Sequence, residues 1–272
     1  MIGGTRNRTM GKSRIIIALI FIGFSLISYL GSKEYNPVTG EDQYISLTPR
    51  QEIALGIQAA PQMIQQHGGL YPEQKYQDMV DNIGLSLVRN SKAAETVYQY
   101  DFHLLNDRQT INAFALPGGQ VFITAALFGK LQTEAQLAGV LGHEIGHVVA
   151  RHSAQQMAKS NLTEGILNGV MVASDPTGSA SQAAQYIGQL VNMKYGRDDE
   201  LESDKLGIRF MVKSGYDPNA LIGVMQILAE ASGGSGQAEF FSTHPNPANR
   251  IEEIKRTIKD LYPNGLPNGL KK

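Results

Sequence analysis

The apolar residues of this 272-residue chain form one long N-terminal run, followed by a series of shorter amphipathic segments. Residues 15–30 are apolar except for Gly23, Ser25 and Ser28, and the four charged residues before them are all basic. As a helix this run spans about 24 Å, less than the roughly 30 Å hydrocarbon core of a bilayer. The pattern predicts that residues 1–31 are a signal peptide or an N-terminal membrane anchor, with the rest of the chain exported.

A short motif ends that run. Tyr29-Leu30-Gly31-Ser32 resembles a bacterial lipobox, but Ser32 stands where the lipidated cysteine would be, and the chain contains no cysteine. A thioether lipid, disulfide bonds and cysteine-ligated metals are therefore excluded. We expect a periplasmic protein that is either soluble or tethered to the inner membrane by residues 15–30, where it can meet other envelope proteins.

The next hundred residues are predicted to form two helices and then several short strands. Thr48-Pro49-Arg50-Gln51 is a capping box with proline at the first helical position, which predicts a helix from Pro49 to Gln66; a second helix fits Pro72 to Asn90. Three stretches rich in β-branched and aromatic residues come next, at Val97–Leu105, Asn112–Leu116 and Gln120–Ala125. Because no long crossover separates them, they predict a small antiparallel or mixed sheet.

From Thr133 onward the pattern is helical again. Thr133-Glu134-Ala135-Gln136 is a second capping box, and the pairs Asp217-Pro218 and Asn246-Pro247 predict the starts of two later helices. Residues 174–184 are rich in Ser, Ala and Gly and are expected to form a mobile lid over the active-site cleft, while residues 233–236 form a flexible link. The chain is predicted to be a mostly helical α+β domain over residues 32–260, with a flexible tail at 261–272.

Composition removes several classes of function. The chain has 24 basic and 25 acidic residues, a net charge of −1, and without its first 31 residues the balance is 20 basic to 25 acidic. This balance argues against nucleic-acid binding, which usually requires a basic surface. With 42% apolar and 18% charged residues, the chain is globular rather than disordered. Any metal site must be built from His, Asp and Glu.

The candidate chemistry is concentrated in His143-Glu144-Ile145-Gly146-His147. Residues four apart on a helix lie on one face, so His143 and His147 can bind a single zinc ion. Glu144 is rotated toward the side where a metal-bound water would lie. The alternative is a chance spacing of two histidines and a glutamate, but the capped, apolar helix around them argues against chance. We therefore expect one Zn²⁺ per chain.

A catalytic zinc of this kind requires a third protein ligand. A metzincin is excluded because Ala150 and Ser153 occupy the positions of its glycine and its third histidine. His152 comes five residues after His147, about 140° away from the ligand face of an ideal helix. We expect His152 to support the ligands rather than to bind the metal.

The third ligand is expected to be a glutamate on another helix. Glu164 is a candidate that lies among Gly and Asn in the sequence, whereas Glu200 has Asp204 four residues later on the same face. Glu200 could bind the metal while Asp204 holds the ring of His143 or His147 through its second nitrogen. The acidic run has another explanation, carboxylates that complement the dipole of a helix N-terminus, and this covers Asp198, Asp199 and Glu202.

These residues resemble the zinc endopeptidases that include the HtpX heat-shock peptidase and the CAAX prenyl protease, peptidase family M48. The resemblance extends over roughly residues 36–260 and is carried by residues 36–40, 112–119, 143–152 and 197–207, by Thr243-His244-Pro245 and by Arg250-Ile251. It implies a gluzincin-type fold, zinc bound by His143, His147 and Glu200, and Glu144 as a catalytic residue. Asp204, His152 and Arg197 are expected to support the ligands.

The function that this resemblance implies is hydrolysis of peptide bonds. Glu144 would take a proton from the attacking water and pass it to the leaving amine. An extended substrate could pair with a strand of four residues if that strand lies at the edge of the sheet, as in the family: Asn112, Ala113, Phe114 and Ala115. Backbone pairing tolerates many sequences, which suits unfolded or misassembled envelope proteins as substrates in protein quality control.

His244 has several interpretations. It could donate a hydrogen bond to the developing oxyanion, or it could swing in as a latch that holds the enzyme inactive. It could also be an ordinary surface histidine before a proline. As a fourth ligand it would close the zinc site, and the protein would then be a non-catalytic chaperone or scaffold with structural zinc. A small-molecule hydrolase is disfavoured because no segment marks a dedicated pocket.

Overall fold

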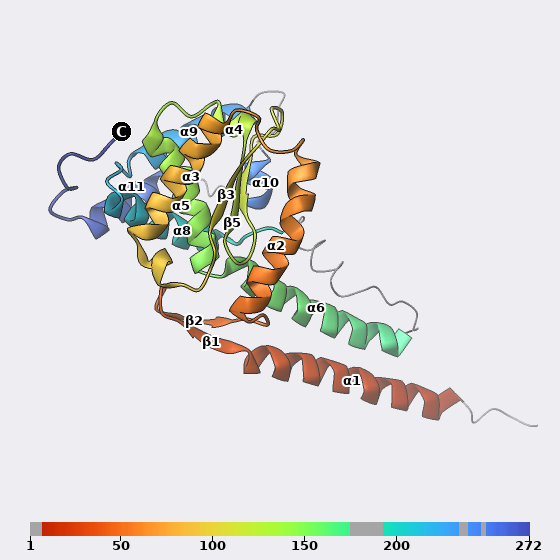
Figure 1. Cartoon of the computed structure of the whole chain (residues 1–272). Helices are drawn as coiled ribbons and strands as arrows, with labels where there is room; N and C mark the ends of the chain where they lie inside the picture. Colours follow the sequence, from red (N-terminus) through yellow and green to blue (C-terminus); the bar gives the residue numbers. More distant parts are fainter. Residues whose placement is uncertain (1–6, 175–192, 234–238, 246–248) are drawn as a thin grey trace, which may run out of the picture. The chain divides into compact units, whose positions relative to one another are not determined.

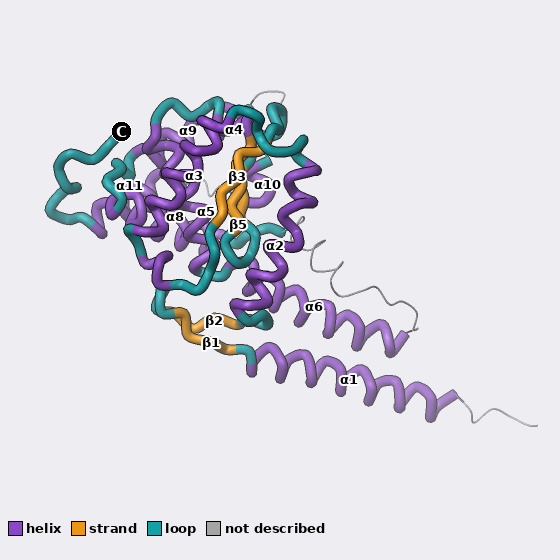
Figure 2. The backbone as a smooth tube through the Cα atoms, in the orientation of Figure 1, coloured by secondary structure: helices purple, strands orange, loops and turns teal. Residues whose placement is uncertain are grey.

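A computed structural model describes residues 7–174, 193–233, 239–245 and 249–272 (Figures 1 and 2). The chain divides into two compact units, Met1–Leu47 with Ala154–Val191, and Thr48–Ser153 with Asn192–Lys272. Residues 32–47 thus group with the segment after Ser153, and the predicted domain bounds of 32–260 stay a prediction. Most of residues 174–184 and 233–236 lie outside the described residues, so the lid and the link stay predictions.

The first unit combines helices with a β-hairpin. It contains α1 (Asn7–Gly31), β1 (Lys33–Asn36), β2 (Glu41–Tyr44) and all but the first two residues of α6 (His152–Ser174). Side chains of α1 that are large and apolar are exposed along much of its described length, among them Ile20, Phe24 and Ile27. Within the described part of the chain, no helix is both long enough and apolar enough to cross a membrane.

The hairpin is closed by the segment that links β1 to β2. The two strands pair antiparallel from Lys33 opposite Tyr44 to Asn36 opposite Glu41. The Asn36 side chain accepts a hydrogen bond from the backbone N–H of Val38 at 2.9 Å, and Gly40 adopts a positive φ of 81°. This left-handed conformation favours glycine because it has no Cβ. The segment that resembled the family start is thus a turn.

Two helices open the second unit. α2 (Pro49–Gln66) has the predicted bounds, and its capping box is confirmed: Gln51 N donates to Thr48 Oγ1 and Thr48 N donates to Gln51 Oε1. α3 (Gln74–Arg89) begins two residues after the predicted Pro72, with Glu73 as its N-cap. A short 3₁₀ helix, η1 (Lys92–Glu95), then leads toward the sheet.

The main sheet has three strands in the order β3–β5–β4. It is a mixed sheet, one of the two alternatives that the sequence predicted. β3 (Asp101–Leu105) runs parallel to β5 (Gln120–Thr124), and β4 (Ala113–Ala115) runs antiparallel to β5. β4 therefore lies at an edge. The turn between β4 and β5 packs against α2 so closely that a Cβ on Gly118 would lie 2.4 Å from the Cα of Ile53.

The candidate ligand helix follows the sheet. α4 (Ala125–Phe128) is a single turn, and α5 (Glu134–Val149) is buried along almost its whole length. Thr133 caps α5 by accepting from Gln136 N, but Gln136 Oε1 accepts from Gln132 N rather than from Thr133. The predicted second capping box is therefore only half formed.

α5 crosses α8 (Arg197–Lys213) at unusually short range, and small residues make this possible. A Cβ on Gly207 would lie 3.1 Å from the carbonyl carbon of Gly142, and a Cβ on Gly146 would lie 2.9 Å from the Ser203 carbonyl oxygen. Backbones this close leave no room for larger residues. The crossing brings the His-bearing face of α5 against the Glu200 face of α8.

Three helices complete the unit: α9 (Ala220–Ser232), α10 (Phe240–Thr243) and α11 (Arg250–Leu261). Asp217 accepts a hydrogen bond from Asn219 N, and α9 starts only at Ala220, later than Asp217-Pro218 predicted. Asn246-Pro247 lies outside the described residues. Near the end of the predicted flexible tail, Lys271 N donates to Gly215 O and Lys271 O accepts from Asp217 N, both at 2.8 Å.

Candidate metal centre

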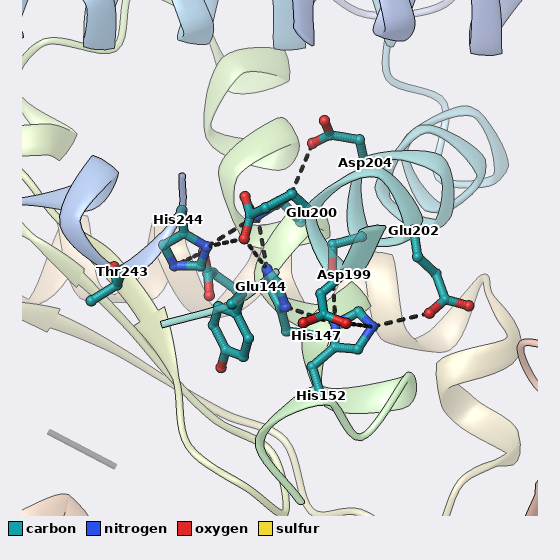
Figure 3. Close-up of polar contacts among 12 residues, drawn as sticks. Glu144, His147, His152, Asp199, Glu200, Glu202, Asp204, Thr243 and His244 are labelled. Carbon is teal, nitrogen blue, oxygen red and sulfur yellow. Dashed lines mark hydrogen bonds and ion pairs between the residues drawn. The ribbon is translucent and has the colours of Figure 1, made fainter. Parts of the chain in front are cut away.

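Three segments of the second unit converge on one point. α5 contributes His143 and His147, α8 contributes Glu200, and His244 directly follows α10. Figure 3 labels His147, Glu200 and His244 of this set. The Nε2 atoms of His143 and His147 lie 3.0 Å apart, and each is 3.4 Å from an oxygen of Glu200. One ligand atom from each of the four residues lies within 4.8 Å of the others, and all four side chains are buried.

The hydrogen bonds of the two histidine rings explain why a cation fits here. His143 Nδ1 lies 2.9 Å from the Asp204 carboxylate, which can only accept, so Nδ1 carries the proton. His147 Nδ1 lies 2.8 Å from His152 Nδ1. With protons on both Nδ1 atoms, two Nε2 lone pairs face each other and the oxygens of Glu200. Such a cluster of lone pairs needs a positive charge, either a proton on His143 in the metal-free protein or a metal ion, and its nitrogen and oxygen donors suit zinc.

Burial and neighbouring charged groups shift the pKa values of the ligands in opposite directions. Burial lowers the pKa of His147 well below its usual value, which keeps the ring neutral. Burial also acts to lower the pKa of His143, but hydrogen bonds to Asp204 and Glu200 outweigh it and raise this pKa to about 9. For Glu200, burial is outweighed by the neighbouring His244 and His143, so the carboxyl stays ionised.

Glu144 lies at the same centre with both of its carboxylate oxygens buried. Among the described residues, neither oxygen has a hydrogen-bond partner, and Oε1 is 3.7 Å from His244 Nε2. Burial raises the pKa of Glu144. A buried, unpartnered carboxyl beside the ligands can take up a proton from a bound water, as a general base requires.

His244 is not a surface residue, so that interpretation is wrong: its side chain is fully buried. Its ring stacks on Phe240 with centroids 4.4 Å apart, and its Nδ1 lies 3.0 Å from Glu200 Oε1 and 3.4 Å from His143 Nε2. The Thr243-His244 segment therefore reaches the ligands, as both active interpretations required. The geometry is compatible with a hydrogen-bond donor and with a fourth ligand.

Asp204 supports His143, one of the two histidines that the sequence left open. Its carboxylate also receives two hydrogen bonds from Arg250 Nε and Nη2, each at 2.9 Å, and Arg250 Nη1 lies 2.8 Å from Glu200 Oε2. Arg250 is thus a buried guanidinium that bridges two carboxylates. Burial acts to raise the pKa of Asp204, but the positive charge of Arg250 and the hydrogen bond with His143 together outweigh it and lower this pKa.

The role of Arg250 was missed, although the sequence holds a signal. Arg250, Ile254 and Ile258 are spaced by four and form the buried face of α11. An arginine on the apolar stripe of an amphipathic helix must be buried, and a buried arginine requires carboxylate partners. Tyr195 was also missed: its ring stacks on His147 with centroids 4.0 Å apart, and no local pattern marks it.

His152 Nδ1 lies 2.8 Å from His147 Nδ1, although an ideal helix would put His152 on another face. α5 ends at Val149, and Arg151 takes a positive φ of 56°, which turns the chain so that His152 faces back toward the site. A non-glycine residue with this φ is strained. Arg151 is held there by a buried ion pair with Glu52 on α2, Nε to Oε1 at 3.2 Å.

Three further residues that the sequence singled out lie on α6 and α8. Arg197 is exposed and donates to Asn249, without contact to the ligands among the described residues, because it is the first residue of α8 and points outward. Glu164 is exposed on α6. Glu202, expected only to complement the helix dipole, instead accepts a hydrogen bond from His152 Nε2 at 3.0 Å.

The predicted substrate strand lies at the edge of the sheet. Leu116 N donates to Gln120 O and Thr124 N donates to Asn112 O, so alternate residues of β4 bond to β5. The backbone groups of Ala113 and Ala115 therefore point away from β5. Phe114 stacks on Phe122 of β5 with centroids 4.8 Å apart.

Comparison with known proteins agrees with this geometry. The family model for Peptidase family M48 matches residues 74–258. The beta-barrel assembly-enhancing protease of Yersinia pestis is 30% identical over 264 residues, which cover 94% of this chain and 54% of that protein. The protein of the same name from Escherichia coli (strain K12) is 28% identical over 257 residues, which cover 91% of this chain and 52% of that protein. The chain thus spans about half the length of these relatives.

A mitochondrial relative matches over a larger share of its own length. The mitochondrial metalloendopeptidase OMA1 of Saccharomyces cerevisiae is 27% identical over 262 residues, which cover 91% of this chain and 75% of that protein. The family model covers more than half of the chain and includes every candidate ligand. The zinc site described above therefore lies in a chain that belongs to peptidase family M48.

Proposed function

We propose that this chain is a zinc endopeptidase that cleaves unfolded or misassembled polypeptides. The observation that carries the proposal is the position of Glu144, whose two buried oxygens lack hydrogen-bond partners among the described residues and lie beside the His143–His147–Glu200 set. A purely structural site needs no free carboxyl at this place. Family membership supports the same reaction.

Each residue of the site has a distinct task in this reaction. His143, His147 and Glu200 would hold the zinc ion, which when bound would supply the Lewis acid that activates water and polarises the scissile carbonyl. The carboxylate of Glu144 accepts a proton from the attacking water and passes it to the leaving amine. Its pKa, raised by burial, makes the carboxyl a stronger base. Asp204 holds the His143 ring so that Nε2 faces the metal.

β4 is the proposed substrate strand. The outward-facing N–H and C=O groups of Ala113 and Ala115 can pair with an extended polypeptide, and pairing through the backbone gives binding without a strict sequence requirement. Asn112, Ala113 and Ala115 are buried, so a substrate strand reaches them only after neighbouring segments move. This selects chains that are already unfolded, because only these offer an extended segment.

The proposed location is the bacterial envelope. Four basic residues precede the apolar run at residues 15–30, the pattern of an export signal or an anchor. The relatives named as beta-barrel assembly-enhancing proteases support envelope proteins as substrates and partners. We also propose that residues 174–184 form the mobile lid past which a substrate enters.

A second candidate function is a non-catalytic chaperone or scaffold. Its support is His244, which makes a four-residue donor set with His143, His147 and Glu200. Four protein ligands would close the coordination sphere of a structural zinc. Under this alternative the protein binds zinc and unfolded chains but hydrolyses nothing.

Cleavage of an unstructured protein separates the two functions. The zinc-loaded chain is incubated with casein, with and without a chelator, and Glu144→Gln serves as the matched variant because it keeps the shape of the side chain. We expect hydrolysis by the wild-type chain, loss of at least 10²-fold in Glu144→Gln and unchanged zinc content in that variant. If the zinc-loaded wild-type chain does not hydrolyse casein, only the scaffold function would remain.

The role of His244 is decided by the same assay. If His244 donates a hydrogen bond to the oxyanion, His244→Ala loses roughly 10²–10³ in kcat. If His244 holds the site closed, the same variant gains activity. Equal activity with equal zinc content would remove both roles.

A further inference from the structure

The two histidine ligands are supported by different groups. His143 Nδ1 is held by the Asp204 carboxylate, which is itself paired with Arg250. His147 Nδ1 is held by another imidazole, that of His152, at 2.8 Å. Figure 3 shows that the contact continues from His152 to Glu202, which comes from α8. The metal ligand His147 is therefore the first of three residues in a hydrogen-bonded series.

The direction of these hydrogen bonds follows from the last residue. An ionised Glu202 can only accept, so His152 Nε2, at 3.0 Å, carries a proton. A neutral imidazole has one donor and one acceptor nitrogen, so His152 Nδ1 is the acceptor. His147 Nδ1 must then donate, and its Nε2 keeps the lone pair that a metal requires. Glu202 thus sets the tautomer of His147 through His152.

The place of His152 is fixed from two sides. The strained turn at Arg151, held by the buried ion pair with Glu52, brings His152 back toward α5. On the other side, the His147 ring stacks on Tyr195, whose hydroxyl lies 3.0 Å from Ser153 Oγ. His152 is fully buried, whereas the side chain of Glu202 is 25% exposed.

We propose that His152 is a positioning residue, held by Glu202, that fixes the tautomer and ring orientation of the zinc ligand His147. The proposal rests on the zinc site of the proposed function but not on its peptidase activity. Outer residues of this kind typically contribute 10- to 100-fold to metal affinity. In this proposal, His152 and Glu202 hold His147 in the way that Asp204 and Arg250 hold His143.

The test uses variants that separate the hydrogen bond from the volume of the ring. His152→Leu removes the acceptor, whereas His152→Asn keeps an acceptor oxygen near the place of Nδ1. Glu202→Leu removes the outer acceptor, and Glu202→Gln keeps one. His103→Leu is the control, because His103 is a partly buried histidine on β3 that bonds to Gln120 away from the ligands.

Three readouts are made on the full chain: zinc affinity by competition with a chromophoric chelator, the visible spectrum of the cobalt(II)-loaded protein, and the tautomer of His147 from nitrogen-15 NMR of the metal-free protein. For His152→Leu we expect zinc binding about 10- to 100-fold weaker, a changed cobalt spectrum, and His147 shifted toward its Nε2–H tautomer. His152→Asn restores most of the affinity. Glu202→Leu weakens binding and Glu202→Gln does not.

Wild-type affinity, spectrum and tautomer in His152→Leu would overturn the proposal. If His152→Leu does not fold, the Glu202 pair decides, because the partly exposed Glu202 tolerates both substitutions; equal affinity and tautomer in Glu202→Leu and Glu202→Gln would then overturn it. An equal loss in His103→Leu would show a general destabilisation and also count against it. None of these readouts requires hydrolysis, so an inactive chain that binds zinc would contradict only the proposed function.

Discussion

The short crossing between α5 and α8 gives the sharpest test of how the fold builds the site. Gly146 lies between the two histidine ligands on α5, and a Cβ there would lie 2.9 Å from Ser203 O and 3.0 Å from Ser203 Cα. Ordinary contacts of this kind are near 3.5 Å, so Gly146→Ala must push the helices apart by about 0.5 Å. Ser203 lies between Glu200 and Asp204, so both carboxylates move with it.

The magnitude follows from two opposing effects. Alanine stabilises a helix interior by about 1 kcal/mol relative to glycine. Overpacking of a tight contact costs about 1–3 kcal/mol. The free energy of unfolding of the metal-free protein should therefore fall by only about 0–2 kcal/mol. Zinc is more sensitive, because ligand distances must hold within about 0.2 Å. A shift of about 0.5 Å should weaken zinc binding tenfold or more, equivalent to at least about 1.4 kcal/mol.

Gly139→Ala is the matched control on the same helix. Its new Cβ would lie 3.4 Å from Leu221 Cδ1, an ordinary contact with the end of a flexible side chain. We expect Gly139→Ala to keep wild-type zinc affinity. Both variants are measured by chelator competition for zinc and by urea unfolding without metal. Equal zinc affinity in Gly146→Ala and Gly139→Ala would refute the argument that the close crossing sets the ligand geometry.

Three further predictions concern charges. Arg250→Met should lower the free energy of unfolding in urea by about 3–5 kcal/mol, because it leaves Asp204 buried without its partner; a loss below about 1 kcal/mol would contradict this. Burial lowers the pKa of His143, but its two carboxylate partners raise it to about 9. Zinc must displace that proton, so its affinity should rise about tenfold per pH unit up to about pH 9, and calorimetry in different buffers should detect proton release. Burial of Asp107 is outweighed by hydrogen bonds from its own loop and from His67, which lower its pKa from 3.8 to about 2. The resulting stability is present above pH 3.8 and is lost as the pH falls toward 2, so Asp107→Asn should lower the free energy of unfolding at pH 7 by about 1–2 kcal/mol and remove that acid dependence.

The parts of the site that the sequence determined are those fixed by local geometry. Residues four apart on a helix share a face whatever the rest of the chain does, so His143 and His147 could be paired from their spacing alone. The capping box at Thr48 was predicted for the same reason, since it depends on neighbouring residues, whereas the sheet was predicted only as antiparallel or mixed. Glu200 required the acidic pattern together with the family resemblance.

The tertiary structure decided which residues meet across elements. The sequence could not choose whether Asp204 holds His143 or His147, because that depends on how α8 crosses α5, and the close approach at Gly146 settles it. The ideal-helix angle misplaced His152, because α5 ends at Val149 and the chain then turns at Arg151.

Arg250 shows the remaining gap between sequence and structure. Its position on the apolar stripe of α11 indicates burial, but its partners Glu200 and Asp204 lie about fifty residues earlier in the chain. A charge buried away from water is stable only where folding supplies an opposite charge, and which charge arrives is decided by the packing of whole helices. Local pattern determined the two histidines of the zinc site, whereas the charges that hold its ligands in place came from the packing of α5, α8 and α11.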